Sequence, residues 1–414
     1  MKHIFELMRG LVPVVAAGFI SLGSTDVSHA SDATAAPKVF CDDPATLLAS
    51  KTALAAGDVT LKPALARLLA EADKRLKQKA VSVMDKNQVP PSGDKHDFIS
   101  QAPYFWRDTN SPDGKYIRKD GERNPESNND SDSGRFQKTC ADVHTLALAY
   151  YLSGDEKYAA KAAELVRVWF LDPATHMNPN LNYGQGIPGE VEGRPAGLIS
   201  ARGLVHLVDA IGLIAGSKAW TADDQKNMTA WFTDYLHWLT TSKVGRGELG
   251  AKNNHGTYCD TQAASIALFL GKTDVASNIV AEAKEKRVTR QITPDGREPM
   301  ELARTTSFGY STFNLRALMD LASIGRAAGV DLWHFQTADG RSILKATEFM
   351  APYVDPGHKW PYQQIHPANQ NDLAELLFRA AAEFPDSQPV KDALKSVKAD
   401  GGNPARLYLK VAVN

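Results

Sequence analysis

The chain contains few cysteines: Cys41, Cys140 and Cys259 are the only three among 414 residues. Three cysteines allow at most one intramolecular disulfide and leave one thiol free. No two of them have the close spacing of a zinc-binding motif. These facts exclude a disulfide-held scaffold, so the core must come from packing. The pairing of Cys140 with Cys41 or with Cys259 stays open.

The chain also lacks a strong charge of either sign. Its formal net charge of −1 excludes a bulk field that would attract nucleic acid or a membrane surface. A polyanionic partner would therefore have to bind in a local basic cleft. The eleven histidines include no His-x-x-x-His pair, so we expect neither a metal site nor a cofactor.

Long apolar runs are missing beyond the first residues, so we expect no membrane insertion. The N-terminus itself has the signature of an export signal. Lys2 and Arg9 precede a short apolar run at 11–23, and small residues stand at 28 and 30. We expect cleavage after Ala30 and delivery to the periplasm or the medium. Residues 31–414 then form the mature chain, which we interpret as a single domain.

Strand patterns are scarce, because no alternating β-branched run is bounded by hairpin turns. Helical periodicity dominates instead, with punctuation at Gly154, Asp155 and Gly271 and a capping-box-like start at Thr221. We predict helices at 64–83, 142–152, 155–170, 198–215, 222–239, 261–270, 275–290 and 315–328. No fixed-period repeat is visible, which argues against a solenoid. We therefore predict an all-α fold, an (α/α) toroid built from helical hairpins.

Two stretches interrupt the helical pattern, at 85–135 and at 176–195. Uncommonly long loops in compact domains are usually functional or disordered, and the aromatic residues at 104–106 argue against plain disorder. The middle of the first stretch brings four cations close together in sequence: Lys115, Arg118, Lys119 and Arg123. We expect it to form a lid or subsite wall over a cleft. A solvated run, offset by neighbouring acids, is the alternative interpretation.

Two separated segments contain the chemistry of proton abstraction beside a carboxylate. The first, at 252–258, holds Asn254 and His255, and the second, at 301–310, holds Arg304 and Tyr310. An amide and a cation can neutralise the carboxylate of a uronic acid, while a phenol or imidazole moves the proton. The structural alternatives are that Asn254 caps a helix, that Arg304 pairs with a nearby glutamate, and that Tyr310 packs in the core.

These residues resemble the alginate lyase-like superfamily of polysaccharide lyases. The resemblance rests on Asn253-Asn254-His255 with the later Arg304 and Tyr310, and on the segments 103–106, 113–126 and 178–185. It spans roughly 103–327 and implies an (α/α) toroid and metal-free β-elimination on a 1,4-linked polyuronate. After Asn-Asn-His, the classical periplasmic enzymes have Ser-Tyr-Trp, whereas this chain has Gly-Thr-Tyr-Cys at 256–259. It is more similar to a divergent branch that acts on alginate or β-1,4-glucuronan.

The resemblance also implies roles for single residues. Asn254 and Arg304, with His255, would bind the C6 carboxylate and stabilise the enolate-like intermediate. Tyr310 would take the C5 proton and return one to O4; a phenol has a pKa near ~10, and Arg304 would favour its phenolate. His255 is the alternative base. The predicted substrate contacts are Tyr104, Trp106, Arg118, Asn182, Tyr183, Gln185 and Tyr258.

Stereochemistry narrows the predicted substrate. H5 and O4 lie on the same ring face in β-D-mannuronate and β-D-glucuronate, so one tyrosine can serve both proton transfers. This favours mannuronan or glucuronan over guluronan. Two other functions stay open: a glycoside hydrolase with paired carboxylates among Asp295, Glu298 and Glu301, and a non-catalytic polyuronate-binding protein. In each case the partner is an anionic polysaccharide, and no obligate protein partner is evident.

Overall fold

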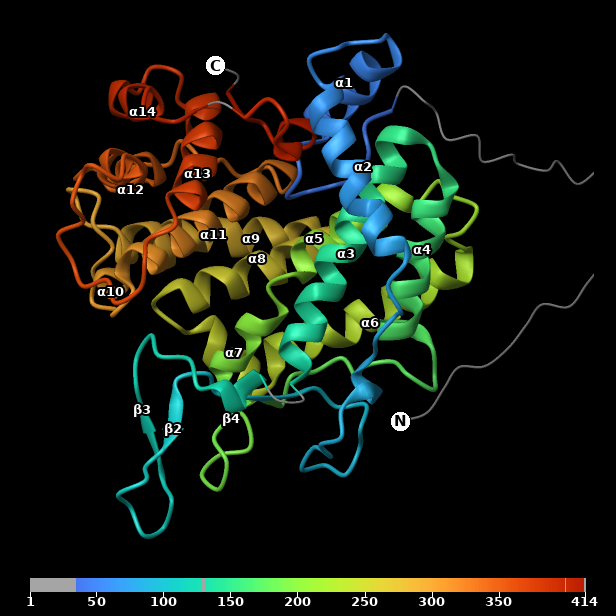
Figure 1. The fold of residues 1–414 in the computed structure, drawn as a ribbon, viewed down its shortest axis with the longest axis vertical. Coiled ribbons are helices and arrows are strands. Elements are labelled where there is room, and N and C mark those ends of the chain that lie inside the picture. Colours follow the sequence, from blue (N-terminus) through green and yellow to red (C-terminus); the bar gives the residue numbers. More distant parts are fainter. Residues whose placement is uncertain (1–34, 129–130, 399, 413–414) are drawn as a thin grey trace, which may run out of the picture.

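The computed structural model describes residues 35–128, 131–398 and 400–412. The predicted export signal at 1–30 lies outside these residues. Helices dominate the described chain (Figure 1). They are α1 (Pro44–Ala55), α2 (Lys62–Leu76), α3 (Asp132–Ser153), α4 (Glu156–Val166), α5 (Leu204–Ile214), α6 (Ala222–Thr241), α7 (Lys243–Leu249), α8 (Asn254–Phe269), α9 (Thr273–Ala283), α10 (Pro299–Leu302), α11 (Ser307–Ala327), α12 (Ile343–Met350), α13 (Gln370–Glu383) and α14 (Gln388–Leu394).

The helices form an open α/α toroid, as the sequence predicts. Helices α3, α5, α8, α11 and α13 pack against one another in that order and form the inner layer. The partners α4, α9 and α12 pack on the outside of α3, α8 and α11. A C-terminal 3-10 turn, Pro404–Leu407, contacts α1 and α2, so the last described residues return to the first helices.

The predicted helix boundaries hold where capping chemistry is strong. Gly154 ends α3 at φ 74° in the left-handed region, and Asp155 caps α4 by accepting the N–H of Lys157 at 3.1 Å. Thr221 and Asp224 form a complete capping box on α6. The inner helices α3, α8 and α11, however, begin earlier than predicted. Their first turns are buried polar sequence, which hydrophobic periodicity does not detect.

Four short strands form where the sequence predicts loops. β1 (Ile99–Gln101) pairs in parallel with β4 (Tyr183–Gly186), and β2 (Phe105–Arg107) pairs with β3 (Tyr116–Arg118) as an antiparallel hairpin. The expectation that no hairpin strands are present is thus wrong for this region. The β1–β4 pairing joins the two stretches that interrupt the helical pattern. Together they extend from one end of the helical body (Figure 1).

The interior of the toroid is packed with apolar side chains, and all three cysteines are buried free thiols. Neither of the two pairings of Cys140 that the sequence left open is formed. One stretch, Pro195–Ile214, is long and apolar enough to cross a membrane by length and composition, contrary to our reading of the sequence. It is mostly buried inside the helical body and includes the inner helix α5. Its apolar character is explained by its place in the core.

Candidate active site

A cleft of about 760 Å³ lies at the end of the toroid where the inner helices begin. Its lining includes the first residues of α3, α8 and α11 and the residues just before α5. Helix N-termini carry partial positive charge and attract anions. The structure brings seven predicted site residues together here: Tyr104, Arg118, Gln185, Asn254, His255, Arg304 and Tyr310.

The charge of the cleft lining is one-sided. Five arginines line it: Arg118, Arg123, Arg194, Arg202 and Arg304. Among the described residues of the lining there is no aspartate or glutamate. A low-dielectric cleft lined by one sign of charge concentrates ligands of the opposite sign. The cleft is therefore suited to a polyanionic chain.

Tyr310 stands between a guanidinium and a second phenol. Arg304 Nη2 donates a hydrogen bond to Tyr310 Oη at 2.7 Å, and Tyr310 Oη donates to Tyr104 Oη at 2.8 Å. The Arg304 guanidinium also lies 3.7 Å from the centroid of the Tyr310 ring. Burial raises the pKa of Tyr310 well above its ordinary value, and neighbouring Tyr104 adds to this rise while Arg304 opposes it. Arg304 therefore favours the phenolate, as the sequence predicts, but burial and Tyr104 outweigh it and favour the neutral phenol.

Arg304 is fixed by the loop at 85–135. Its Nε lies 3.0 Å from both carboxylate oxygens of Asp120, and Nη2 lies 2.6 Å from Oδ1. Asp120 also accepts the backbone N–H of Thr305 at 3.1 Å. Although burial alone would raise it, these hydrogen bonds lower the pKa of Asp120 to about 2. Arg304 therefore pairs with Asp120 and not with Glu298 or Glu301, which were the alternative partners suggested by the sequence.

Asn254 is the first residue of α8, and Asn253 occupies the cap position. Glu301 accepts the backbone N–H of Asn254 at 2.8 Å and its side-chain Nδ2 at 2.7 Å. The carboxylate of Glu301 thus accepts the hydrogen bonds that Asn254 offers at the start of α8. The sequence suggested that a substrate carboxylate could bind there. Asn254 Oδ1 is buried and has no partner. The contact with Glu301 fixes the orientation of the amide at the cleft floor.

His255 is oriented by a buried carboxylate. Its Nδ1 lies 2.6 Å from Oε1 of Glu248, and only 3% of the Glu248 side chain is exposed. A carboxylate at Nδ1 favours the tautomer that carries its proton there. Nε2 is then the basic atom of the ring. His255 thus has the arrangement of a general base held by an acidic partner.

Two arginines of the cleft were missed by sequence reasoning. The Arg202 guanidinium donates to the Ile199 carbonyl at 3.1 Å and lies over the Phe313 ring. Arg194 donates to the carbonyl of Gln185 at 2.9 Å and to its Oε1 at 3.0 Å. Gln185 is held at φ 49°, the only non-glycine residue of the described chain in the left-handed region. Such strain is frequent at ligand-binding positions. No sequence signal separates these arginines from ordinary surface cations.

Four predicted substrate contacts do not line the cleft. Tyr258 is 5% exposed, and its hydroxyl donates to the Phe313 carbonyl at 3.1 Å, so it is a core residue. The indole N–H of Trp106 donates to a loop carbonyl. Asn182 Oδ1 accepts from Trp238 at 2.9 Å, and Tyr183 is in β4 outside the lining. These corrections reflect tertiary contacts that local sequence does not specify.

The carboxylates proposed for hydrolysis are also elsewhere. Glu298 and Glu301 are buried at 3% and 1% exposure. Asp295 is an exposed residue whose Oδ2 lies 2.6 Å from Arg297. None of the three lines the cleft. The paired acids that hydrolysis requires on either side of a glycosidic bond are thus missing from the described lining.

Comparison with known proteins gives one family. The family model described as alginate lyase matches residues 82–360. A solved alginate lyase from Bacteroides ovatus is 42% identical to the chain, with a TM-score of 0.85 over 90% of this chain and 98% of that one. Alginate lyase A1-III from Sphingomonas species A1 is 17% identical, with a TM-score of 0.52 over 90% and 98%. A variant of that enzyme complexed with a tetrasaccharide gives 0.54 over 92% and 98%. These last two share the fold. No curated protein sequence matches significantly.

Proposed function

The chain belongs to the alginate lyase family of polysaccharide lyases, and from this premise we propose that it cleaves a β-1,4-linked polyuronate by β-elimination. The product would carry a 4,5-unsaturated uronate at its new end. The proposal rests on one observation, the composition of the cleft lining. Hydrogen bonds join Arg304 to Tyr310 and Tyr310 to Tyr104, and these residues line the same cleft as Asn254 and His255. The described lining contains no carboxylate. This arrangement suits elimination and lacks the two acids of a hydrolase.

The first task is to neutralise the C6 carboxylate of the sugar in the cleft. Arg304 supplies a guanidinium and Asn254 an amide oriented by Glu301. Spreading the carboxylate charge onto these donors acidifies the C5 proton, because the enolate-like intermediate places more charge on the same oxygens. Preorganised donors of this kind stabilise the intermediate without reorganising during the reaction.

The second task is to move two protons. Tyr310 is a phenol at neutral pH, since burial raises its pKa, so it is suited to protonate the departing O4. His255 has its Nδ1 bound by Glu248, which leaves Nε2 to accept the C5 proton. We therefore assign the base to His255 and the acid to Tyr310. An imidazole held by a carboxylate at Nδ1 is a common general base.

The substrate that we propose is mannuronan or β-1,4-glucuronan. Both have H5 and O4 on one ring face, so this assignment requires His255 and Tyr310 to act from the same side of the ring. The two sugars differ only at C2. The proposed C2 contact is Gln185, which alone among Asn182, Tyr183 and Gln185 lines the cleft. The arginines outside the reaction centre, Arg118 among them, would bind the carboxylates of neighbouring sugars. We also propose that the enzyme acts after export, in the periplasm or outside the cell.

The test follows the ultraviolet absorbance of the unsaturated uronate on mannuronan, guluronan and glucuronan separately. Reducing ends are measured in parallel. Increasing absorbance on mannuronan or glucuronan supports the proposal, and the faster polymer identifies the substrate. Reducing ends without absorbance would indicate hydrolysis, and binding without either signal would indicate a non-catalytic protein; either result overturns the proposal. Preference for guluronan would overturn the substrate assignment alone.

A further inference from the structure

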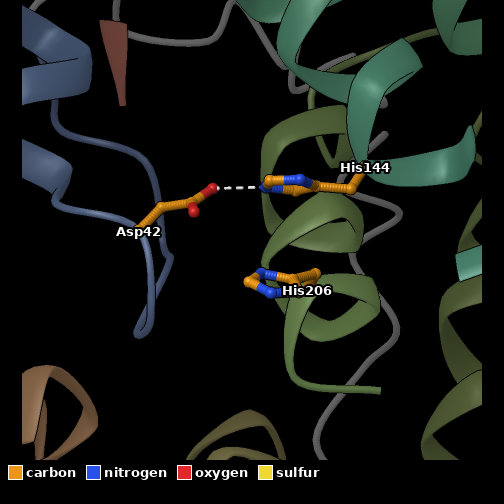
Figure 2. A group of neighbouring side chains, drawn as sticks. All are labelled: Asp42, His144 and His206. Carbon is orange, nitrogen blue, oxygen red and sulfur yellow. Dashed lines mark hydrogen bonds and ion pairs between the residues drawn. The ribbon is translucent and has the colours of Figure 1, made fainter. Parts of the chain in front are cut away.

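Away from the cleft, three side chains meet inside the toroid. Asp42 precedes α1, His144 is on α3 and His206 is on α5, and a ligand atom of each lies within 4.8 Å of the others (Figure 2). His144 Nε2 lies 2.7 Å from Asp42 Oδ2. The imidazole of His206 lies beside that of His144, with ring centroids 5.0 Å apart.

Two atoms of this group lack hydrogen-bond partners. Asp42 Oδ1 is unpartnered although only 1% of the residue is exposed, and the buried Nδ1 of His206 is unpartnered too. A buried polar atom without a partner costs on the order of 1–3 kcal/mol. Two such atoms lie beside the contact between His144 and Asp42. This arrangement indicates that the group is built to share one ligand. Both unpartnered atoms can donate a lone pair, so that ligand would be a cation.

We propose that Asp42, His144 and His206 bind one divalent transition-metal ion, with Zn²⁺ as the best fit. Two imidazoles and one carboxylate are a common zinc ligand set, with a fourth position for water. Ligand atoms about 2.0–2.1 Å from Zn²⁺ at tetrahedral angles lie roughly 3.4 Å apart. His144 Nε2 and Asp42 Oδ2 are 2.7 Å apart, and all three ligand atoms lie within 4.8 Å of one another, so side-chain adjustments would bring them to this spacing. Binding would replace the proton shared by His144 and Asp42, and that proton would leave to solvent.

The backbone around Asp42 is held in place by a second carboxylate. Asp209 on α5 accepts the backbone N–H groups of Phe40, Cys41 and Asp42 at 2.7, 2.9 and 2.7 Å. These bonds fix the turn that directs the Asp42 side chain at the two histidines. Asp42 and Asp209 place two buried carboxylates near one point. A divalent cation with neutral imidazoles would balance their charge, which reduces the cost of burial.

Of the three residues, Asp42 alone lines a second cavity. This cavity of about 250 Å³ is also lined by Cys41, Asp43 and Arg379, and shares no lining residue with the cleft. Metal sites need an entry path and room for water. His144 and His206 are about two turns and one turn further along their helices than Gln137 and Arg202, which line the cleft. The ion would thus tie the segment before α1 to two inner helices, which is a structural role.

The experiment uses the whole mature protein, stripped with a chelator and dialysed. Zn²⁺ alone is titrated by calorimetry, the bound metal is counted by mass spectrometry, and the thermal midpoint is measured with and without Zn²⁺. We expect one ion per chain and a higher midpoint, since a ligand that binds the folded state stabilises it. His206→Ala should lose the bound ion and the midpoint shift, while keeping the fold, because it removes no hydrogen bond to His206 Nδ1.

A matched variant separates this site from adventitious binding. His334 is exposed and pairs with Asp331 through Nδ1 at 2.9 Å, so His334→Ala should leave Zn²⁺ binding unchanged. A wild-type chain that keeps no Zn²⁺ after dialysis overturns the proposal. So does a His206→Ala variant that binds Zn²⁺ as the wild type does. Loss of the ion in His334→Ala but not in His206→Ala would identify a surface site and also overturn it.

Discussion

At the level of single residues, the hydroxyl of Tyr310 is the most constrained atom of the cleft, because it accepts from Arg304 and donates to Tyr104. Tyr310→Phe removes only that hydroxyl. We expect turnover of the polymer to fall by about 10²–10⁴-fold, the typical contribution of a general acid or base. Tyr353 is outside the cleft lining, so Tyr353→Phe is the matched control and should keep wild-type turnover.

A substrate that needs no acid separates the two proton transfers. In a 4-deoxy-4-fluoro uronide, fluoride departs from C4 without protonation. Tyr310→Phe should therefore recover most of the wild-type rate on this substrate, whereas His255→Ala should stay inactive. Equal loss in Tyr310→Phe on both substrates would show that Tyr310 also takes the C5 proton and would refute the assignment of His255 as base.

Glu298 gives a pH-dependent prediction. Burial raises its pKa well above the ordinary value, and the charge of Glu301 adds to this rise. The folded state therefore holds a proton that the unfolded state releases above about pH 4.3, so the free energy of unfolding falls as pH rises from there toward the folded-state pKa. The slope is about 1.4 kcal/mol per pH unit within that window.

Glu298→Gln removes this titration and keeps the Oε1 that accepts from Asn314 at 2.6 Å. We expect the variant to gain stability relative to wild type between about pH 5 and pH 8, by at least about 1 kcal/mol. Urea unfolding at both pH values measures this difference. Glu285→Gln, at a largely exposed side chain, should show no such trend. A difference that is constant with pH would contradict a raised pKa at Glu298.

At the level of elements, the loop at 85–135 is fastened to the catalytic segment at Asp120 and Gly121. Gly121 has φ 77°, and a Cβ there would lie 2.3 Å from Thr305 Oγ1. We expect Gly121→Ala to displace this anchor, raise KM for the polymer about tenfold, or about 1.4 kcal/mol, and speed tryptic cleavage at exposed Lys115.

Gly114 at the tip of the β2–β3 hairpin is the matched control. It also has positive φ, at 62°, but a Cβ there would meet only the end of the Arg107 side chain, at 3.2 Å. Gly114→Ala carries a similar backbone cost without touching the anchor, so its KM should match that of the wild type. An equal KM increase in both variants would show that loop strain, and not the Asp120 anchor, determines substrate binding.

The sequence predicts the elements whose signals are local. Capping chemistry at Gly154, Asp155 and Thr221 places helix ends, and apolar periodicity places the outer helices. The inner helix α8 begins at Asn254, seven residues before the predicted start at 261. Its first turns are buried by contact with other inner helices and with Glu301, so no apolar face marks them. Tertiary contacts override the periodic pattern there.

The candidate active site likewise contains residues that the sequence identifies and residues that only tertiary contacts reveal. The sequence identifies four site residues because an amide, an imidazole, a guanidinium and a phenol together suit proton abstraction beside a carboxylate. These residues are Asn254, His255, Arg304 and Tyr310. Their positioning partners are not found, since Asp120 lies 184 residues from Arg304 in the chain and Glu248 could be any helical glutamate. Tyr258 is chemically suited to bind sugar, yet packing against Phe313 buries it. Chemistry suggests candidates, and only the fold shows which of them reach the cleft.

At the level of the whole molecule, the toroid separates two regions. The cleft lies where the inner helices begin, and residues of the strands line part of it. Figure 1 shows these strands and their hairpin at one end of the helical body. The Asp42–His144–His206 group lies further along the inner helices, near the segment that precedes α1 and the returning C-terminal residues. Substrate contacts and structural contacts can therefore change independently.

Export is a prediction for the whole chain. When the full sequence is expressed in a host that secretes proteins through signal peptides, we expect the recovered protein to begin at Ser31, because the small residues at 28 and 30 suit signal peptidase. Mass spectrometry of the protein from the periplasm or medium measures its N-terminus. A chain that stays in the cytoplasm with Met1 in place would contradict the prediction.

We propose that the enzyme cleaves the glycosidic bond by elimination, and the mass of the products distinguishes elimination from hydrolysis. Wild-type enzyme is incubated with mannuronan and with glucuronan, and the shortest oligosaccharides are weighed by mass spectrometry. We predict that each fragment bearing a new non-reducing end lacks one water relative to the hydrolysis product, because a C4–C5 double bond replaces the lost O4 and H5. Fragments that carry that water would contradict the elimination and, with it, the roles assigned to Tyr310 and His255.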